Sequence, residues 1–110
     1  MRHYLIVLFW AFVASISYGQ EVTYFSDIEE IVINKCAPCH RKDGYGPFPL
    51  TTYEEVKSKG SFIGHVTKTK YMPPWKADPD FQSYKNQIIL TDNEIDKIQS
   101  WISNGFKKGK

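Results

Sequence analysis

The stretch Cys36-Ala37-Pro38-Cys39-His40 places two thiols and one imidazole within five residues. Residues that are three or four positions apart lie on the same side of a helical turn. The sulfurs of Cys36 and Cys39 and the ring of His40 are therefore expected to face one direction. A single flat group could bind all three side chains from that side.

This pentapeptide is typical of covalent haem attachment in an exported chain. Each thiol can add to one haem vinyl group as a thioether, and the His40 ring can reach the iron. A thiol redox pair normally follows a strand, whereas the residues before Cys36 predict a helix. A zinc site needs four ligands, and Cys36, Cys39, His40 and His65 would include two adjacent residues, which strains a tetrahedron. A disulfide would close a ring too small to stabilise much. The spacing favours haem c.

Working outward, capping patterns predict short helices on both sides of the pentapeptide. Capping boxes occupy Ser26–Glu29, Thr51–Glu54 and Thr91–Glu94. Ser61 is a candidate cap for a further helix, and Asn104-Gly105 has the chemistry of a helix C-terminus. No stretch alternates convincingly at period two, so we expect an all-α domain.

Breaks between these helices are also marked in the sequence. Asp43–Pro49 holds two glycines and two prolines, so it is expected to be a loop. Pro73-Pro74 stops the helix that precedes it, because proline disfavours helix both before and within itself. Phe106–Lys110 has the composition of a disordered end.

The first residues have the pattern of a secretory signal peptide. A basic start is followed by the uncharged apolar run Tyr4–Val13, and small residues at Ser17 and Gly19 fit a cut after Gly19. The run is short of the roughly 20 residues that span a bilayer, although an uncleaved anchor stays an alternative. We therefore expect a signal peptide over 1–19 and one small domain over 20–110 that is periplasmic or otherwise exported. Membrane contact is expected only if the signal segment is not cleaved.

The charge balance excludes one class of partner. A net charge of +2 over 110 residues is too low for a typical nucleic-acid-binding domain. Five lysines nevertheless gather within twenty residues: Lys57, Lys59, Lys68, Lys70 and Lys76. They are either a solvated helical face or a basic rim that steers an acidic partner.

A candidate for the sixth position of the iron is Met72, in Tyr71-Met72-Pro73-Pro74-Trp75. A thioether is a soft and weak ligand, so it needs a rigid backbone, which the two prolines can supply. Ligation by histidine and methionine also raises the reduction potential. The alternative is a methionine that fills a gap in the core.

At this point the chain resembles a class I cytochrome c, in the small bacterial branch with a Met-Pro-Pro-Trp distal loop. The resemblance covers roughly Ser26–Phe106. It implies short helices wrapped around one covalent haem, with Cys36 and Cys39 as attachments, His40 as proximal ligand and Met72 as distal ligand.

The resemblance extends to the contact between the terminal helices and then departs from the family. Ile98 and Trp101 match the family's aliphatic and aromatic pair in the last helix and would pack on the helix before Cys36. Ile28 and Val32 stand where the family often has a small and an aromatic residue, which leaves the crossing angle of these helices open.

The same resemblance suggests further residues around the cofactor. In the family, a proline after the motif offers its carbonyl to the proximal histidine, and either Pro47 or Pro49 could do so, with Pro47 favoured. His65 is an alternative distal ligand. Three aromatic residues are candidates to line the haem or bond its propionates, or are ordinary core: Trp75, Tyr53 and Tyr45.

These features predict a monomeric electron-transfer protein that is not an enzyme and that works with redox protein partners. Two other functions stay open. A gas-binding or peroxide-reducing haem protein would need Met72 to leave the iron, and a non-haem thiol oxidoreductase would lack haem altogether.

Overall fold

The computed structural model describes residues 19–74, 78 and 80–110. Helical elements follow in chain order: η1 (Tyr24–Ile28), α2 (Glu29–Lys35), α3 (Tyr53–Ser58), α4 (Gly60–Lys68) and α5 (Asp92–Ser103). The described residues contain no strand, which confirms the all-α prediction. Within the described part, no helix is long and apolar enough to cross a membrane. The predicted signal peptide, apart from Gly19, lies outside the described residues, as do Trp75 and Lys76.

The N-terminal helix begins earlier than its capping pattern predicted. Its first turn is a π-helical turn with Thr23 at the cap, and the Thr23 N–H donates to the Asp27 carboxylate at 3.2 Å. The next two N–H groups, of Tyr24 and Phe25, donate to carbonyls of Lys107 and Lys108 at 2.8 and 3.1 Å. The expected Ser26–Glu29 capping box was wrong because a distant segment of backbone caps this helix instead.

The remaining helix starts follow the sequence more closely. Thr91 and Glu94 form the capping box that opens α5, as predicted. The box that opens α3 joins Thr52 to Glu55, one residue later than expected. Lys59 rather than Ser61 precedes α4, and it makes no side-chain cap, since α4 continues almost directly from α3.

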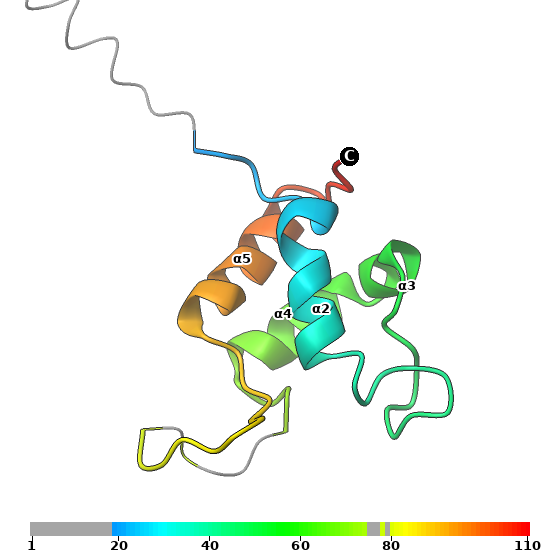
Figure 1. Ribbon diagram of the computed structural model, residues 1–110. Helices are drawn as coiled ribbons and strands as arrows, with labels where there is room; N and C mark the ends of the chain where they lie inside the picture. Colours follow the sequence, from blue (N-terminus) through cyan, green and yellow to red (C-terminus); the bar gives the residue numbers. More distant parts are fainter. Residues whose placement is uncertain (1–18, 75–77, 79) are drawn as a thin grey trace, which may run out of the picture.

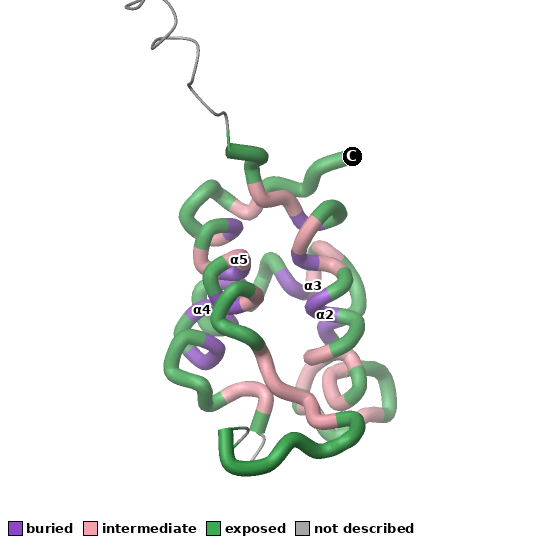
Figure 2. The backbone as a smooth tube through the Cα atoms, turned by 60° about the vertical axis from the view of Figure 1, so that its left-hand side comes forward, coloured by how far each residue is buried: buried purple, intermediate pink, exposed green. Residues whose placement is uncertain are grey.

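The core lies where the two terminal helices meet. Ile98 and Trp101 of α5 are buried in one cluster with Tyr24 and Ile28. The rings of Trp101 and Tyr24 lie 5.8 Å apart, so the expected contact between the last helix and the helix before Cys36 is present. In Figure 2 the buried residues line the facing sides of these helices.

The C-terminal residues belong to this core, so the expectation of a disordered end was wrong. Asn104 and Gly105 end α5 as predicted, with Gly105 at a φ of 81°. The Phe106 N–H then donates to the Trp101 carbonyl at 3.0 Å, and the rings of these two residues lie 5.1 Å apart. This is a Schellman ending with its usual hydrophobic contact, and it turns the tail back over the core.

Two long loops lie at the other end of the molecule. Residues 41–51 follow the cysteines, and residues 71–90 join α4 to α5. Figure 1 shows both loops at the end opposite the C-terminus. The helices therefore bring residues of both loops to one cleft at this end and close the core at the other.

Candidate cofactor cleft

A cleft of about 540 Å³ opens between the two loops and α4. This volume falls within the range of roughly 300–1,000 Å³ that is typical of cofactor and ligand sites. Most of its described lining is apolar or aromatic: Lys35, Cys36, Cys39, His40, Tyr45, Gly46, Pro47, Phe48, Leu50, Phe62, Ile63, Val66, Thr67, Met72, Pro73, Pro74 and Ile88. The cleft thus brings together five of the predicted site residues, Cys36, Cys39, His40, Pro47 and Met72.

The two cysteines lie on the turn that follows α2. The Cys36 N–H donates to the Val32 carbonyl at 3.0 Å, and the Cys36 carbonyl accepts from the N–H groups of Cys39 and His40 at 3.2 and 2.9 Å. This turn places both sulfurs on the cleft wall. Both cysteines are free thiols, so the structure holds no disulfide between them. Burial raises the pKa of the Cys36 thiol to about 11, which keeps it neutral at ordinary pH.

The His40 ring is fixed by the loop that follows it. Its Nδ1 lies 3.0 Å from the Phe48 carbonyl oxygen and donates to it, because a carbonyl only accepts. In the neutral imidazole this hydrogen bond leaves the lone pair of Nε2 free, and that is the form in which histidine binds metals. The Phe48 ring also lies 4.9 Å from the His40 ring.

Pro47 was the favoured carbonyl partner of His40, and that prediction was wrong. The partner is the residue between the two prolines, because the loop turns so that the Phe48 carbonyl faces the ring. Pro47 instead lines the cleft. The sequence marked the loop correctly but gave no signal for which of three successive carbonyls would face inward.

Gly46 gives the His40 ring its space. A Cβ atom at this position would lie 2.5 Å from Nδ1 and 2.7 Å from Cγ of His40. No side chain fits between this backbone and the ring. Loop backbone bonds hold the arrangement, since the Gly46 N–H donates to Cys39 and the Leu50 N–H to His40, both at 2.9 Å.

Met72 lines the opposite part of the cleft from the end of α4. Its N–H and that of Tyr71 both donate to the Val66 carbonyl, at 3.0 and 2.9 Å. Lys70 makes this ending possible with a φ of 58°, a left-handed conformation usually left to glycine. Met72 is half-buried, and Pro73 and Pro74 continue the cleft wall after it.

The other residues that were predicted to lie near the cofactor are found in different parts of the structure. His65 is exposed on α4 and does not line the cleft, so it is poorly placed to replace Met72. Tyr53 lies in the core at the other end, where its hydroxyl donates to the Phe106 carbonyl at 2.8 Å. Tyr45 lines the cleft mouth and is fully exposed. Trp75 lies outside the described residues.

The zinc alternative finds no support in this geometry. Among the described residues, no group of three or more His, Cys, Asp or Glu side chains could hold a metal ion. Cys36, Cys39 and His40 share the cleft, but His65 does not join them.

The cleft fits a large, flat, apolar group better than water. Phe62 lines it and is 55% exposed, although its neighbour Ile63 is buried. Apolar surface of this kind is stabilised when an apolar group covers it. The donor set fits haem c, since two thiols, one imidazole and one thioether line the same cleft. Phe48 and Phe62 were not predicted as site residues, and only their closeness to Pro47 and Ile63 in the sequence could have pointed to them.

Comparisons with protein-family models, with curated proteins and with solved structures return no match for this chain. The site is therefore interpreted from its own residues.

Proposed function

We propose that this chain is an exported, monomeric c-type cytochrome with a single haem, similar to the class I family, that carries single electrons between redox proteins. One observation carries the proposal: Cys36, Cys39, His40 and Met72 line the same apolar cleft. Met72 follows His40 by 72 − 40 = 32 residues in the sequence, and the fold nevertheless brings it to the cleft that the pentapeptide lines.

Each residue has a defined role in this proposal. Cys36 and Cys39 form the thioether attachments, the Nε2 atom of His40 is the proximal ligand, and the Met72 sulfur is the distal ligand. The bound haem supplies an iron that accepts and releases one electron. The Phe48 carbonyl fixes the His40 ring and raises its basicity as a ligand. The apolar lining excludes water, which favours the less charged form of the site.

The lining supports electron transfer rather than catalysis. It includes no Asp or Glu among the described residues, so no carboxylate is available there as a general acid or base. The neutral Cys36 thiol also argues against a thiol oxidoreductase, because such enzymes depend on cysteines whose pKa is lowered.

The partner surface in this proposal is the basic side of the cleft. Lys35 lines the cleft, and the Lys59 ammonium lies 5.1 Å from the centre of the Phe48 ring. Lys57 and Lys68 are exposed nearby in the sequence. A redox protein with an acidic surface would be attracted to this side, so electron-transfer rates to such a partner should fall as salt rises. Rates that are independent of salt would contradict this part of the proposal.

The test is production of the chain in cells that attach haem c, followed by a haem stain of the denatured protein. We expect the stain to remain with the chain, and to be lost in the double variant Cys36→Ala/Cys39→Ala. The oxidised protein should have the weak far-red absorption band of methionine ligation, which Met72→Ala removes and His65→Ala leaves intact. A colourless chain would refute the proposal, and a haem-stained chain that lacks the band would reassign the distal ligand.

A further inference from the structure

A second, smaller hollow lies beside the cleft and shares a wall with it. Its volume is about 130 Å³, and its described lining is Thr67, Lys70, Met72, Pro73, Ile89, Leu90 and Ile95. Thr67, Met72 and Pro73 line both spaces. Met72 is therefore the methionine that separates the cofactor cleft from the hollow.

The hollow is large enough for the end of the Met72 side chain. A water molecule in the liquid takes about 30 Å³, so the hollow has room for several atoms of that size. The end of a methionine side chain is only three heavy atoms, and it is flexible and unbranched. Ile89, Leu90 and Ile95 give the hollow the apolar wall that a thioether prefers.

Nothing that the structure describes ties the Met72 side chain to the cleft. The hydrogen bond that holds this residue runs through its backbone N–H to Val66. The neighbouring Thr67 hydroxyl donates to the Ile63 carbonyl at 2.8 Å and to the Gly64 carbonyl at 3.3 Å, both within α4. Its one hydrogen is thus used, and Thr67 cannot anchor the sulfur.

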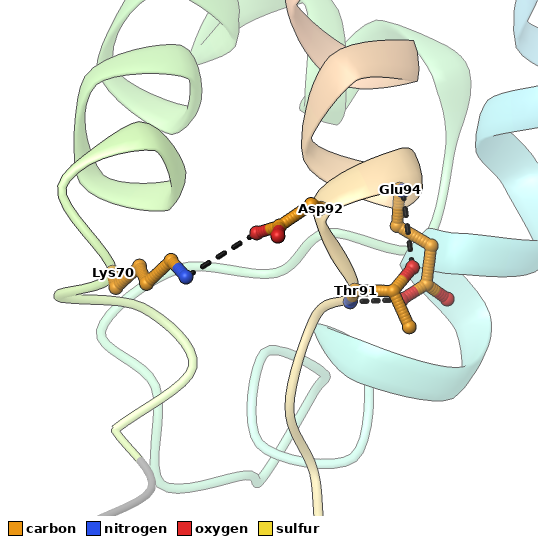
Figure 3. A network of polar contacts seen from close by, with 4 residues as sticks. All are labelled: Lys70, Thr91, Asp92 and Glu94. Carbon is orange, nitrogen blue, oxygen red and sulfur yellow. Dashed lines mark hydrogen bonds and ion pairs between the residues drawn. The ribbon is translucent and has the colours of Figure 1, made fainter. Parts of the chain in front are cut away.

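Hydrogen bonds and an ion pair hold the backbone segments that border the hollow, whereas no such contact holds the Met72 side chain among the described residues. In Figure 3 the start of α5 is held by Thr91 and Glu94, which bond each other at 2.7 and 3.2 Å. Lys70 reaches across from the end of α4 to Asp92 at 3.3 Å. Both side chains of this pair are mainly exposed, so the pair adds little stability, but it joins the two segments that border the hollow.

We propose that Met72 is an exchangeable distal ligand whose side chain swings into this hollow, so that the cleft binds a small uncharged diatomic molecule such as carbon monoxide or nitric oxide. This rests on the proposed haem binding and adds an activity to electron transfer. With reduced haem bound, the Met72 sulfur would give up its bond to the iron and carbon monoxide would take its place. No proton or electron is transferred, because the thioether leaves as a neutral group.

The first test is a nuclear magnetic resonance experiment on the reduced, haem-loaded protein under carbon monoxide. We expect the Met72 ε-methyl group to lose the ring-current shift of the bound state and to show nuclear Overhauser contacts with methyl groups of Leu90 and Ile95. Contacts with Phe62 or Ile88 of the cleft instead, or no contacts with the hollow, would overturn the proposal. So would a failure of carbon monoxide to bind at neutral pH.

A pair of isoleucine variants supplies the second test. Ile89 lines the hollow but not the cleft, so Ile89→Phe should fill the space that Met72 needs. We expect its affinity for carbon monoxide to fall by about tenfold, since overpacked sites resist a further side chain. Ile33→Phe, on an exposed position of α2, is the matched control and should keep the original affinity. Equal affinities in the two variants would overturn the proposal.

The two proposals can fail separately. A chain without haem in the denaturing stain would refute the cytochrome proposal itself. A haem-stained protein with the far-red band, but with Met72 outside the hollow in the carbon monoxide complex, would leave the cytochrome in place and refute only the exchange.

Discussion

The two ends of this molecule use aromatic residues in opposite ways. At the closed end, Trp101 and Tyr24 are 1% and 2% exposed. At the open end, around the cleft, Phe62 is 55% exposed and Tyr45 fully exposed. The chain thus completes its own core at one end and supplies only one side of a core at the other. That difference is what a domain built around a bound cofactor requires.

Hydrogen bonding repeats the contrast. At the closed end, the tail serves two elements at once, because the Lys107 carbonyl accepts from both the Tyr24 N–H and the Trp101 ring N–H, at 2.8 and 2.9 Å. At the open end, the bonds near the cleft hold individual side chains, as the bond between His40 and Phe48 does. Hydrogen bonds of the tail therefore join separate elements at the closed end, whereas those near the cleft fix single side chains in position.

The largest expected effect is loss of the closed end in Trp101→Ala. Removing a fully buried tryptophan should lower the free energy of unfolding by about 3–5 kcal/mol. A small domain has little more stability than this, so urea unfolding of the haem-loaded protein is the suitable measurement. Phe81→Ala, in the loop at the open end, is the control, and it should cost clearly less because Phe81 is 88% exposed and does not line the cleft. Equal losses in the two variants would contradict the distinction between the ends.

The second effect tests the open end through Gly46→Ala. The new Cβ would lie 2.5 Å from the His40 ring, so the ring or the loop must move. We expect a stability loss of about 1–3 kcal/mol, together with an altered haem spectrum, since a displaced ring changes the iron ligand. Gly105→Ala at the closed end is the control for the spectrum: its φ of 81° makes alanine strained there, but no atom lies within 4 Å of its Cβ position, so the haem spectrum should not change. An unchanged spectrum in Gly46→Ala would show that the His40 position does not depend on this glycine.

The same contrast explains which features the sequence could predict. Local sequence patterns predicted correctly the features whose hydrogen-bond partners are close in the sequence. The Thr91–Glu94 capping box and the helix ending at Gly105 are of this kind. Local patterns failed at Ser26, because the carbonyls that cap the first helix come from Lys107 and Lys108, about eighty residues away. No local pattern can report such a contact.

The candidate site likewise contains some residues that the sequence could predict and others that it could not. The spacing of Cys36, Cys39 and His40 follows from one helical turn, so these residues could be predicted to share a face. Met72 could be selected only through the resemblance to a family and the prolines beside it. The Phe48 carbonyl could not be distinguished from that of Pro47, since a loop's fine path depends on packing against the ring it serves.

A smaller effect is expected from Tyr53→Phe, which removes one bond that fastens the tail at the closed end. The Tyr53 hydroxyl donates to the Phe106 carbonyl at 2.8 Å, and both groups are partly buried. Loss of such a bond should cost about 0.5–1.5 kcal/mol of unfolding free energy. Tyr71→Phe is the control, since Tyr71 is 70% exposed next to the cleft loop. If both variants unfold at the same urea concentration, the tail contributes less to the closed end than its contacts suggest.

The smallest effect compares one lysine from each end. Lys108 pairs with Glu54 at 3.3 Å, and its ammonium lies 5.0 Å from the centre of the Tyr53 ring. Among the described residues, Lys70 pairs with Asp92 alone, also at 3.3 Å, and the Lys70 side chain is 71% exposed. Lys108→Ala should therefore cost about 1 kcal/mol, because a contact with an aromatic face adds to an exposed ion pair.

For Lys70→Ala the expected cost is about 0.5 kcal/mol at most, and it should vanish in about 1 M salt, where charges are screened within roughly 3 Å. Unfolding midpoints of both variants at low and high salt measure the difference. Part of the Lys108→Ala loss should survive high salt, because the Lys108 ammonium also lies over the Tyr53 ring, a contact that the Lys70 pair lacks. Equal sensitivity to salt would mean that both lysines act as simple surface charges. The closed end would then owe its tighter construction to its buried aromatic residues and backbone bonds alone.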